Sequence, residues 1–243
     1  MTKNSPVKSL QHLGFAPSVA IFGTAAVAMI FGTHFLIPIL HRTLGWERII
    51  LWFLVAGLGV FLPMLIASYV MIRKEGQCFD RKLWIERLRF RALSARDWLW
   101  AVAAIGAIAL SSAVILKLLE LIVGSINSKP LFMSLQPLSA GRYWILLIWF
   151  PYWLLNIFGE EIFWRGVLLP RQELVFGGKT WLVHGFFWGI FHIAFGWRLL
   201  ITLLPILFIQ SYVVYRRQNT WLGVFIHALI NGPSFIAISL GRI

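Results

Sequence analysis

Long apolar runs separated by short basic loops limit what this chain can fold into. A helix needs about 20 apolar residues to cross the hydrocarbon core of a bilayer. Seven runs approach or exceed this length: residues 14–41, 48–72, 97–123, 142–170, 178–197, 199–215 and 219–240. We therefore predict an all-α membrane protein, a polytopic bundle of about seven transmembrane helices, or eight if residues 178–215 are divided differently.

The composition excludes an ordinary soluble protein and argues against a nucleic-acid partner. Charged residues make up 13% of the chain, whereas soluble domains carry about 25%. The net charge of +13 would suit nucleic acid, but the basic residues lie in loops, where membrane topology and anionic lipid account for them. We expect contact with membrane lipid and no nucleic acid. The chain contains no linker, so we predict a single membrane domain over residues 1–243, with N-terminal helices at 14–123 and a core at about 140–240.

The distribution of Lys and Arg predicts the orientation. Basic residues are more frequent in the loops on the side of the N-terminus, which places that end in the cytoplasm. Lys3 and Lys8 precede an apolar run that is too long for a signal peptide, so we expect a retained first helix in a bacterial inner membrane. Residues 73–97 supply most of the charge bias and form either an amphipathic interfacial helix or an ordinary basic loop. Cys78 is the only cysteine, which excludes an intrachain disulfide.

Charged groups inside the membrane are costly, and each one is a functional hypothesis. The only aspartates, Asp80 and Asp97, lie in the basic loop. This excludes an aspartyl intramembrane protease, which needs two aspartates in the membrane. Ser234 follows Gly232-Pro233 but does not lie in the Gly-x-Ser-x-Gly element of a nucleophilic serine, and no HExxH zinc motif is present.

Two adjacent carboxylates on an apolar helix are the strongest indication of a site. Glu160 and Glu161 point about 100° apart, so they have different roles. Glu161 and Arg165 are spaced to form an i,i+4 ion pair. Glu160 has no such partner on its helix, and an apolar environment favours its neutral form, which suits a general base near neutral pH. A purely structural Glu–Arg network is the alternative.

Three further polar residues lie at similar depth on later helices. His192 follows Trp188 by four residues, and His227 and Asn231 share one helix face. At about 1.5 Å per residue, Glu160, His192, His227 and Asn231 lie roughly 15, 20, 12 and 18 Å from the cytoplasmic ends of their spans. A common depth indicates one shared site in the cytoplasmic half. Gln210 is a further polar residue within the apolar runs.

These motifs resemble the CPBP family, which groups type II CAAX prenyl endopeptidases with bacteriocin-processing and self-immunity (Abi-like) membrane proteins. The family pattern is EExxxR, FxxxH and HxxxN on successive helices. Glu160 to Arg165 matches the first motif, and His227 to Asn231 matches the third. The segment from Trp188 to His192 matches the second except that Trp replaces Phe. The resemblance covers about residues 140–240.

The resemblance implies an intramembrane endopeptidase acting on a hydrophobic or lipidated peptide near the cytoplasmic side. Glu160 would activate water and His192 would position it, while His227 and Asn231 would stabilise the oxyanion. Glu161 and Arg165 would fix the helix and tune Glu160. Trp188 would reshape the entrance of the site without affecting the proton chemistry.

Three alternatives remain at this stage. A catalytic zinc ion held by His192, His227 and Glu160 is one, although we favour a metal-free glutamate mechanism because no two of these ligands share a helical turn. A non-catalytic immunity or chaperone-type protein that binds a hydrophobic partner in the same cavity is the second. A transporter is the third, but it predicts repeat symmetry that the sequence does not contain.

Overall fold

The computed structural model describes residues 10–76, 80–124 and 130–242, and all regular structure in these ranges is helical. Lys3, Lys8 and Cys78 lie outside the described residues. Six helical stretches are long and apolar enough to cross a membrane. The chain is therefore an integral membrane protein of the predicted all-α class.

The helical elements lie end to end in long rods. In chain order they are α1 (Phe15–Ile30), η1 (Phe31–Leu36), α2 (Ile37–Leu44), α3 (Arg48–Ala56), η2 (Gly57–Phe61), α4 (Leu62–Lys74), α5 (Arg81–Arg87), α6 (Ala95–Val123), η3 (Leu131–Met133), η4 (Ala140–Arg142), α7 (Ile145–Glu160), η5 (Glu161–Leu168), α8 (Leu169–Phe176), η6 (Gly177–Lys179), α9 (Thr180–Phe191), η7 (His192–Phe195), α10 (Trp197–Arg217) and α11 (Thr220–Ser239). The stretch from Ile145 to Phe195 counts as one apolar unit, but Gly177 breaks it with a φ of 49°. The predicted number of about seven long helices is therefore confirmed.

The helix predicted over residues 142–170 differs from the expectation in its length and its interior. It begins at Ile145 and continues through α8 to Phe176, so Pro170 does not end it. Between α7 and α8 the segment η5 is a π-helix. The depth estimate for Glu160 assumed an end at Pro170 and was wrong on that point.

A proline follows each of the π-helical segments in the described chain. Pro38, Pro63 and Pro170 lie two residues beyond the ends of η1, η2 and η5. Proline lacks a backbone N–H and clashes with the carbonyl four residues earlier, and in membrane helices a local π adjustment can satisfy the freed carbonyl. We attribute η5 to Pro170 in this way. Prolines within α7, α10 and α11 lie in α-helical surroundings, so proline permits the adjustment without enforcing it.

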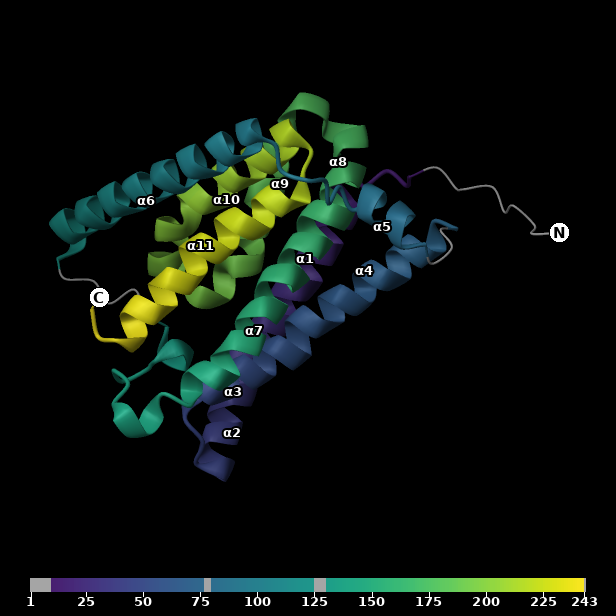
Figure 1. Ribbon diagram of the computed structural model, residues 1–243. Helices are drawn as coiled ribbons and strands as arrows, with labels where there is room; N and C mark the ends of the chain where they lie inside the picture. The colour runs from purple at the N-terminus through teal and green to yellow at the C-terminus, as the bar shows by residue number, and fades with distance from the viewer. Residues whose placement is uncertain (1–9, 77–79, 125–129, 243) are drawn as a thin grey trace.

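The rod formed by α7, η5 and α8 runs through the middle of the bundle (Figure 1). It packs against α4 on one side and α11 on the other, while α9 packs between α1 and α10. Helix α6 lies at the outside, where it contacts α10 and α11. Its exposed Leu99, Val102, Leu121 and Ile122 suit a surface that faces lipid.

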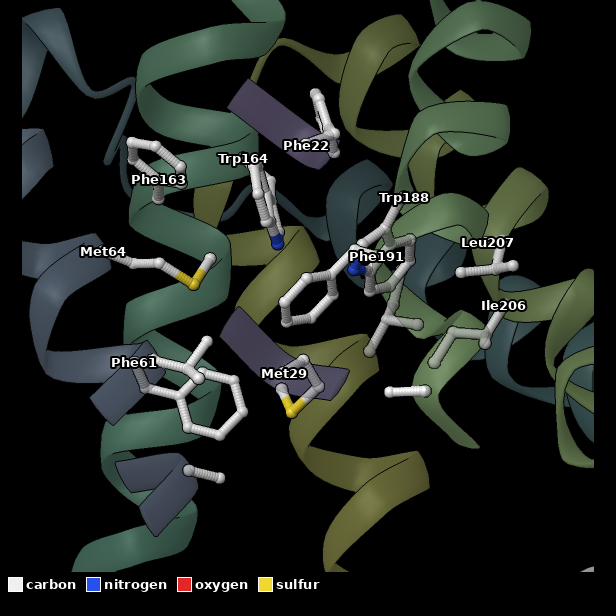
Figure 2. Packing of buried hydrophobic residues seen from close by; sticks show 14 of the residues in the cluster. Phe22, Met29, Phe61, Met64, Phe163, Trp164, Trp188, Phe191, Ile206 and Leu207 are labelled. Carbon is white, nitrogen blue, oxygen red and sulfur yellow. The ribbon is translucent and has the colours of Figure 1, made fainter. Parts of the chain in front are cut away.

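Aromatic side chains fill the space where α1, η5 and α9 meet. The rings of Phe22 and Trp164 stack with centroids 4.2 Å apart, and Phe191 contacts Trp164 at 5.4 Å. Figure 2 shows Trp188 next to this cluster, with its indole nitrogen directed toward the central rod. This packing fixes α9 against the rod that carries both glutamates.

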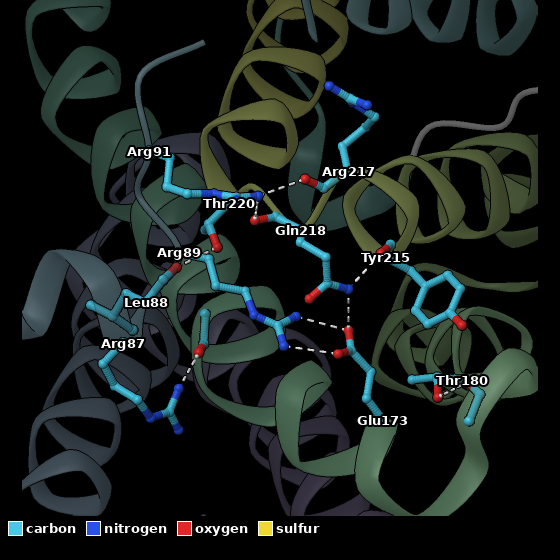
Figure 3. A network of polar contacts seen from close by, with 12 residues as sticks. Arg87, Leu88, Arg89, Arg91, Glu173, Thr180, Tyr215, Arg217, Gln218 and Thr220 are labelled. Atoms are coloured by element: carbon cyan, nitrogen blue, oxygen red, sulfur yellow. Dashed lines mark hydrogen bonds and ion pairs between the residues drawn. The ribbon is translucent and has the colours of Figure 1, made fainter. Parts of the chain in front are cut away.

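The segment Arg87 to Arg91, which we call the strap, contacts η5, α8 and the turn between α10 and α11 (Figure 3). Arg87 donates to the Gly166 carbonyl, Arg89 donates twice to Glu173, and Arg91 donates to the carbonyls of Arg217 and Gln218. In return, Thr220 donates its hydroxyl to Leu88 O and its backbone N–H to Arg89 O.

The sequence analysis left two alternatives for residues 73–97, an amphipathic interfacial helix and an ordinary basic loop. The strap bears on both. Helix α5 is only seven residues long, and the chain after it turns inward, where Leu88 is buried against Gly166. The basic segment is thus neither a long interfacial helix nor a free loop. Its arginines tie together elements that are distant in the sequence.

Candidate active site

Both carboxylate oxygens of Glu160 accept a hydrogen bond from a buried donor. The amide of Asn156, one turn earlier on α7, lies 2.9 Å from Oε1. The indole Nε1 of Trp188 on α9 lies 2.7 Å from Oε2. The sequence analysis predicted no ion-pair partner for Glu160 on its own helix and overlooked Asn156, a neutral donor at the i−4 position on the same face.

Glu161 is the centre of a second, fully buried group. Its Oε1 accepts from Arg165 at 3.2 Å, from Gln210 at 2.8 Å and from His227 at 2.9 Å. The i,i+4 pair between Glu161 and Arg165, which the sequence predicted, is present. The other two donors come from α10 and α11, so Glu161 holds three rods together.

Trp188 joins the two glutamate groups. The guanidinium of Arg165 lies 3.5 Å from the centre of the Trp188 ring, a distance typical of a cation–π contact. The ring also meets His192 and His227 edge to face at 5.4 and 5.7 Å. Trp188 was expected only to shape the entrance, but its hydrogen bond to Glu160 places it in contact with the predicted base.

The hydrogen bonds of the two histidines define their available nitrogen atoms. His192 Nδ1 lies 2.8 Å from the Trp188 carbonyl, so Nδ1 donates and Nε2 of the neutral ring is an acceptor. His192 and Glu160 both contact Trp188, which brings them to the same side of α9 and the central rod. His227 likewise donates from Nδ1 to Glu161, which leaves its Nε2 for another partner.

Asn231 is the predicted site residue that the structure does not join to the others. It lies one turn beyond His227 on α11 and is half-buried. Within the described part of the chain, no hydrogen bond reaches its side chain. Its predicted role at an oxyanion thus remains an expectation based on its position.

Sequence reasoning missed Asn156 and Gly223 and left Gln210 without a role. Asn156 could have been found from its i−4 spacing to Glu160. Gln210 and Gly223 contact Glu161 only through the packing of α10 and α11 against η5. A Cβ atom on Gly223 would lie 2.2 Å from Glu161 Oε2, so this position admits no side chain without a shift.

The donor set does not fit a zinc site. Among the described residues, no three His, Cys, Asp or Glu side chains lie together as metal ligands. Both oxygens of Glu160 accept hydrogen bonds from Asn156 and Trp188 instead. We therefore derive no step through a metal ion.

An apolar cavity of about 370 Å³ lies elsewhere, between α1 and α4. It reaches Phe163 on η5, but none of the predicted site residues lines it. The candidate active site is the polar cluster on the other side of the central rod and not this cavity.

Comparison with protein families identifies the same part of the chain. Residues 142–232 match the family model described as type II CAAX prenyl endopeptidase, Rce1-like. Comparison with curated proteins and with solved structures found no match. The predicted family resemblance is confirmed over this region, which contains every predicted site residue and supports an intramembrane CAAX-type endopeptidase in general.

Proposed function

Because residues 142–232 are Rce1-like, we propose that the chain is an intramembrane endopeptidase in which Glu160 activates a water molecule. The observation that carries the proposal is the carboxylate of Glu160, which is 2% exposed and lies on a membrane helix near His192. A carboxylate so placed is expensive to bury. Its placement within the family-matched region favours a chemical role.

The proposed reaction is hydrolysis by general acid–base catalysis. Glu160 accepts a proton from water, and the resulting hydroxide attacks the scissile carbonyl carbon. Glu160 then gives this proton to the leaving nitrogen as the C–N bond breaks, which yields a carboxylic acid and an amine. His192 Nε2, as an acceptor, would orient the same water molecule.

Two residues would stabilise the negative oxygen of the intermediate. Asn231 can donate from its neutral amide. His227 already donates from Nδ1 to Glu161, so donation from Nε2 as well requires a ring that carries both hydrogens. Each such donor is typically worth about 3–4 kcal/mol in the transition state.

The substrate class we propose is a hydrophobic or lipidated peptide. The site lies among membrane helices, so a substrate must be able to enter from lipid or from the end of the bundle. The matching family model is described as a CAAX prenyl endopeptidase, so we include prenylated peptides among those to be tested. The alternative function is that of a binding protein, which would hold a hydrophobic partner in the same site without cleaving it.

The test is peptide cleavage by purified wild type and Glu160→Gln in detergent. We expect Glu160→Gln to lose about 10²- to 10⁴-fold in rate, because a general base contributes this much. A panel of farnesylated and unmodified hydrophobic peptides, assayed with and without a chelator, defines the substrate class and tests the metal-free mechanism.

The matched control is Glu86→Gln, which removes an exposed carboxylate on α5 and should retain full activity. Equal cleavage by wild type and Glu160→Gln would refute the proposed base. Loss of cleavage in chelator, with recovery on added zinc, would replace the metal-free mechanism. Tight binding of a panel peptide without cleavage would favour the binding-protein alternative.

A further inference from the structure

We propose that Trp188, together with Asn156, is a positioning residue that holds the Glu160 carboxylate in the orientation needed to activate water. This inference rests on the proposed function and adds to it a role for the residue at which the chain departs from the FxxxH pattern. A phenylalanine at this position has no hydrogen-bond donor. The tryptophan supplies an indole N–H directed at Glu160.

The geometry fixes the carboxylate from both sides. Asn156 donates to Oε1 and Trp188 donates to Oε2, at 2.9 and 2.7 Å. Two donors on different oxygens determine the rotation of the carboxylate plane. Because an ionised carboxylate offers about four acceptor positions, each oxygen keeps a lone pair for a water molecule.

Trp188 is itself held in place by its surroundings, so its indole can keep the Glu160 carboxylate in one orientation. Its side chain is 1% exposed, and the guanidinium of Arg165 covers one face of the ring at 3.5 Å. The carbonyl of Trp188 accepts from His192 Nδ1. One residue therefore orients both groups that we expect to contact the attacking water.

Trp188→Phe is the informative substitution. Phenylalanine keeps an aromatic face for Arg165 but removes the donor to Glu160. Misplacement of a reacting group by about 1 Å can cost about 100-fold, so we expect kcat to fall by about 10- to 100-fold. KM should change little, because Trp188 is not expected to bind the substrate.

Trp164→Phe provides a matched control. Trp164 is also fully buried beside the site, and its indole N–H has no acceptor among the described residues. The two substitutions remove the same atoms, but only one removes a hydrogen bond to Glu160. We expect Trp164→Phe to keep kcat within about twofold in the folded fraction.

An NMR measurement tests the hydrogen bond without relying on activity. In protein labelled with ¹⁵N at its 13 tryptophan indoles, Trp188→Phe identifies one signal by its loss. We expect Glu160→Gln to shift this signal, whereas Glu86→Gln should not. An unshifted Trp188 signal in Glu160→Gln would overturn the inference.

The kinetic outcomes separate this inference from the function on which it rests. Full activity in Trp188→Phe, combined with inactivity of Glu160→Gln, would overturn the positioning role alone. Full activity in Glu160→Gln would overturn the proposed function. Equal losses in Trp188→Phe and Trp164→Phe would show that packing, and not the indole donor, is responsible.

Discussion

The carboxylate of Glu161 illustrates how closely single residues are fitted in this protein. One of its oxygens accepts three hydrogen bonds, from Arg165, Gln210 and His227. The other oxygen lies against the Cα atom of Gly223, where a Cβ would approach to 2.2 Å. The three donors leave the carboxylate little freedom to move away.

Gly223→Ala should therefore destabilise the protein. The added methyl group must displace either Glu161 or α11, and overpacking of this kind costs about 1–3 kcal/mol. The thermal unfolding midpoint in detergent should fall, and cleavage activity should fall with it.

Gly106→Ala is the control for the effect of the methyl group itself. A Cβ at Gly106 on α6 meets no atom within 4 Å, and alanine favours a helix more than glycine does. Its unfolding midpoint should be unchanged or raised. A Gly223→Ala protein as stable as this control would show that Glu161 relaxes freely.

At the scale of elements, the strap connects parts of the chain that the sequence separates widely. Arg89 and Gln218 both adopt positive φ, at 59° and 53°, and both donate to Glu173. Such a conformation is uncommon for residues other than glycine. The hydrogen bonds at Glu173 compensate for it.

Arg89→Gln should loosen the strap. It removes a two-point contact with a partly buried carboxylate, and hydrogen bonds to charged groups contribute about 1.5–3 kcal/mol. We expect a lower unfolding midpoint and faster trypsin cleavage between residues 73 and 96.

Arg96→Gln tests whether charge alone is responsible. Arg96 is exposed, and substitutions of this kind usually change stability by less than about 0.5 kcal/mol. It should match wild type in both assays. If Arg89→Gln also matched wild type, the strap contacts would not contribute to stability.

At the scale of the whole molecule, the orientation of the helical bundle in the membrane is a prediction based on the Lys and Arg residues of its loops. Placing the N-terminus inside puts α5 on the cytoplasmic side and η4 on the outer side. In Figure 1, α5 and the segment before α7 lie at opposite ends of the bundle. Labelling of single cysteines can therefore determine the orientation.

In a Cys78→Ser background, we expect a membrane-impermeant maleimide to label Gly141→Cys in intact cells. Glu86→Cys should react only in inside-out vesicles. Both positions are exposed, so detergent should allow labelling of each and serves as the control. The opposite pattern would reverse the predicted orientation.

The sequence predictions were accurate for interactions between residues close in the sequence and failed for contacts between distant segments. The long helices and the Glu161–Arg165 pair were predictable because hydropathy and i,i+4 spacing are local properties. The bond from Trp188 to Glu160 depends on how α9 packs against the central rod, and no local pattern contains that information. The π-helical turn and the strap were missed for the same reason, since each depends on backbone or tertiary geometry.

The pairing of Glu161 with Arg165 on one helix has a consequence for biogenesis. Chains are synthesised from the N-terminus, so the segment that carries both glutamates emerges before α10 and α11. A lone carboxylate near the bilayer centre resists insertion by a few kcal/mol, but Glu161 enters the translocon with its counter-ion four residues away. The ion pair therefore lowers the cost of inserting Glu161, and Gln210 and His227 find an acceptor already in place when their helices arrive.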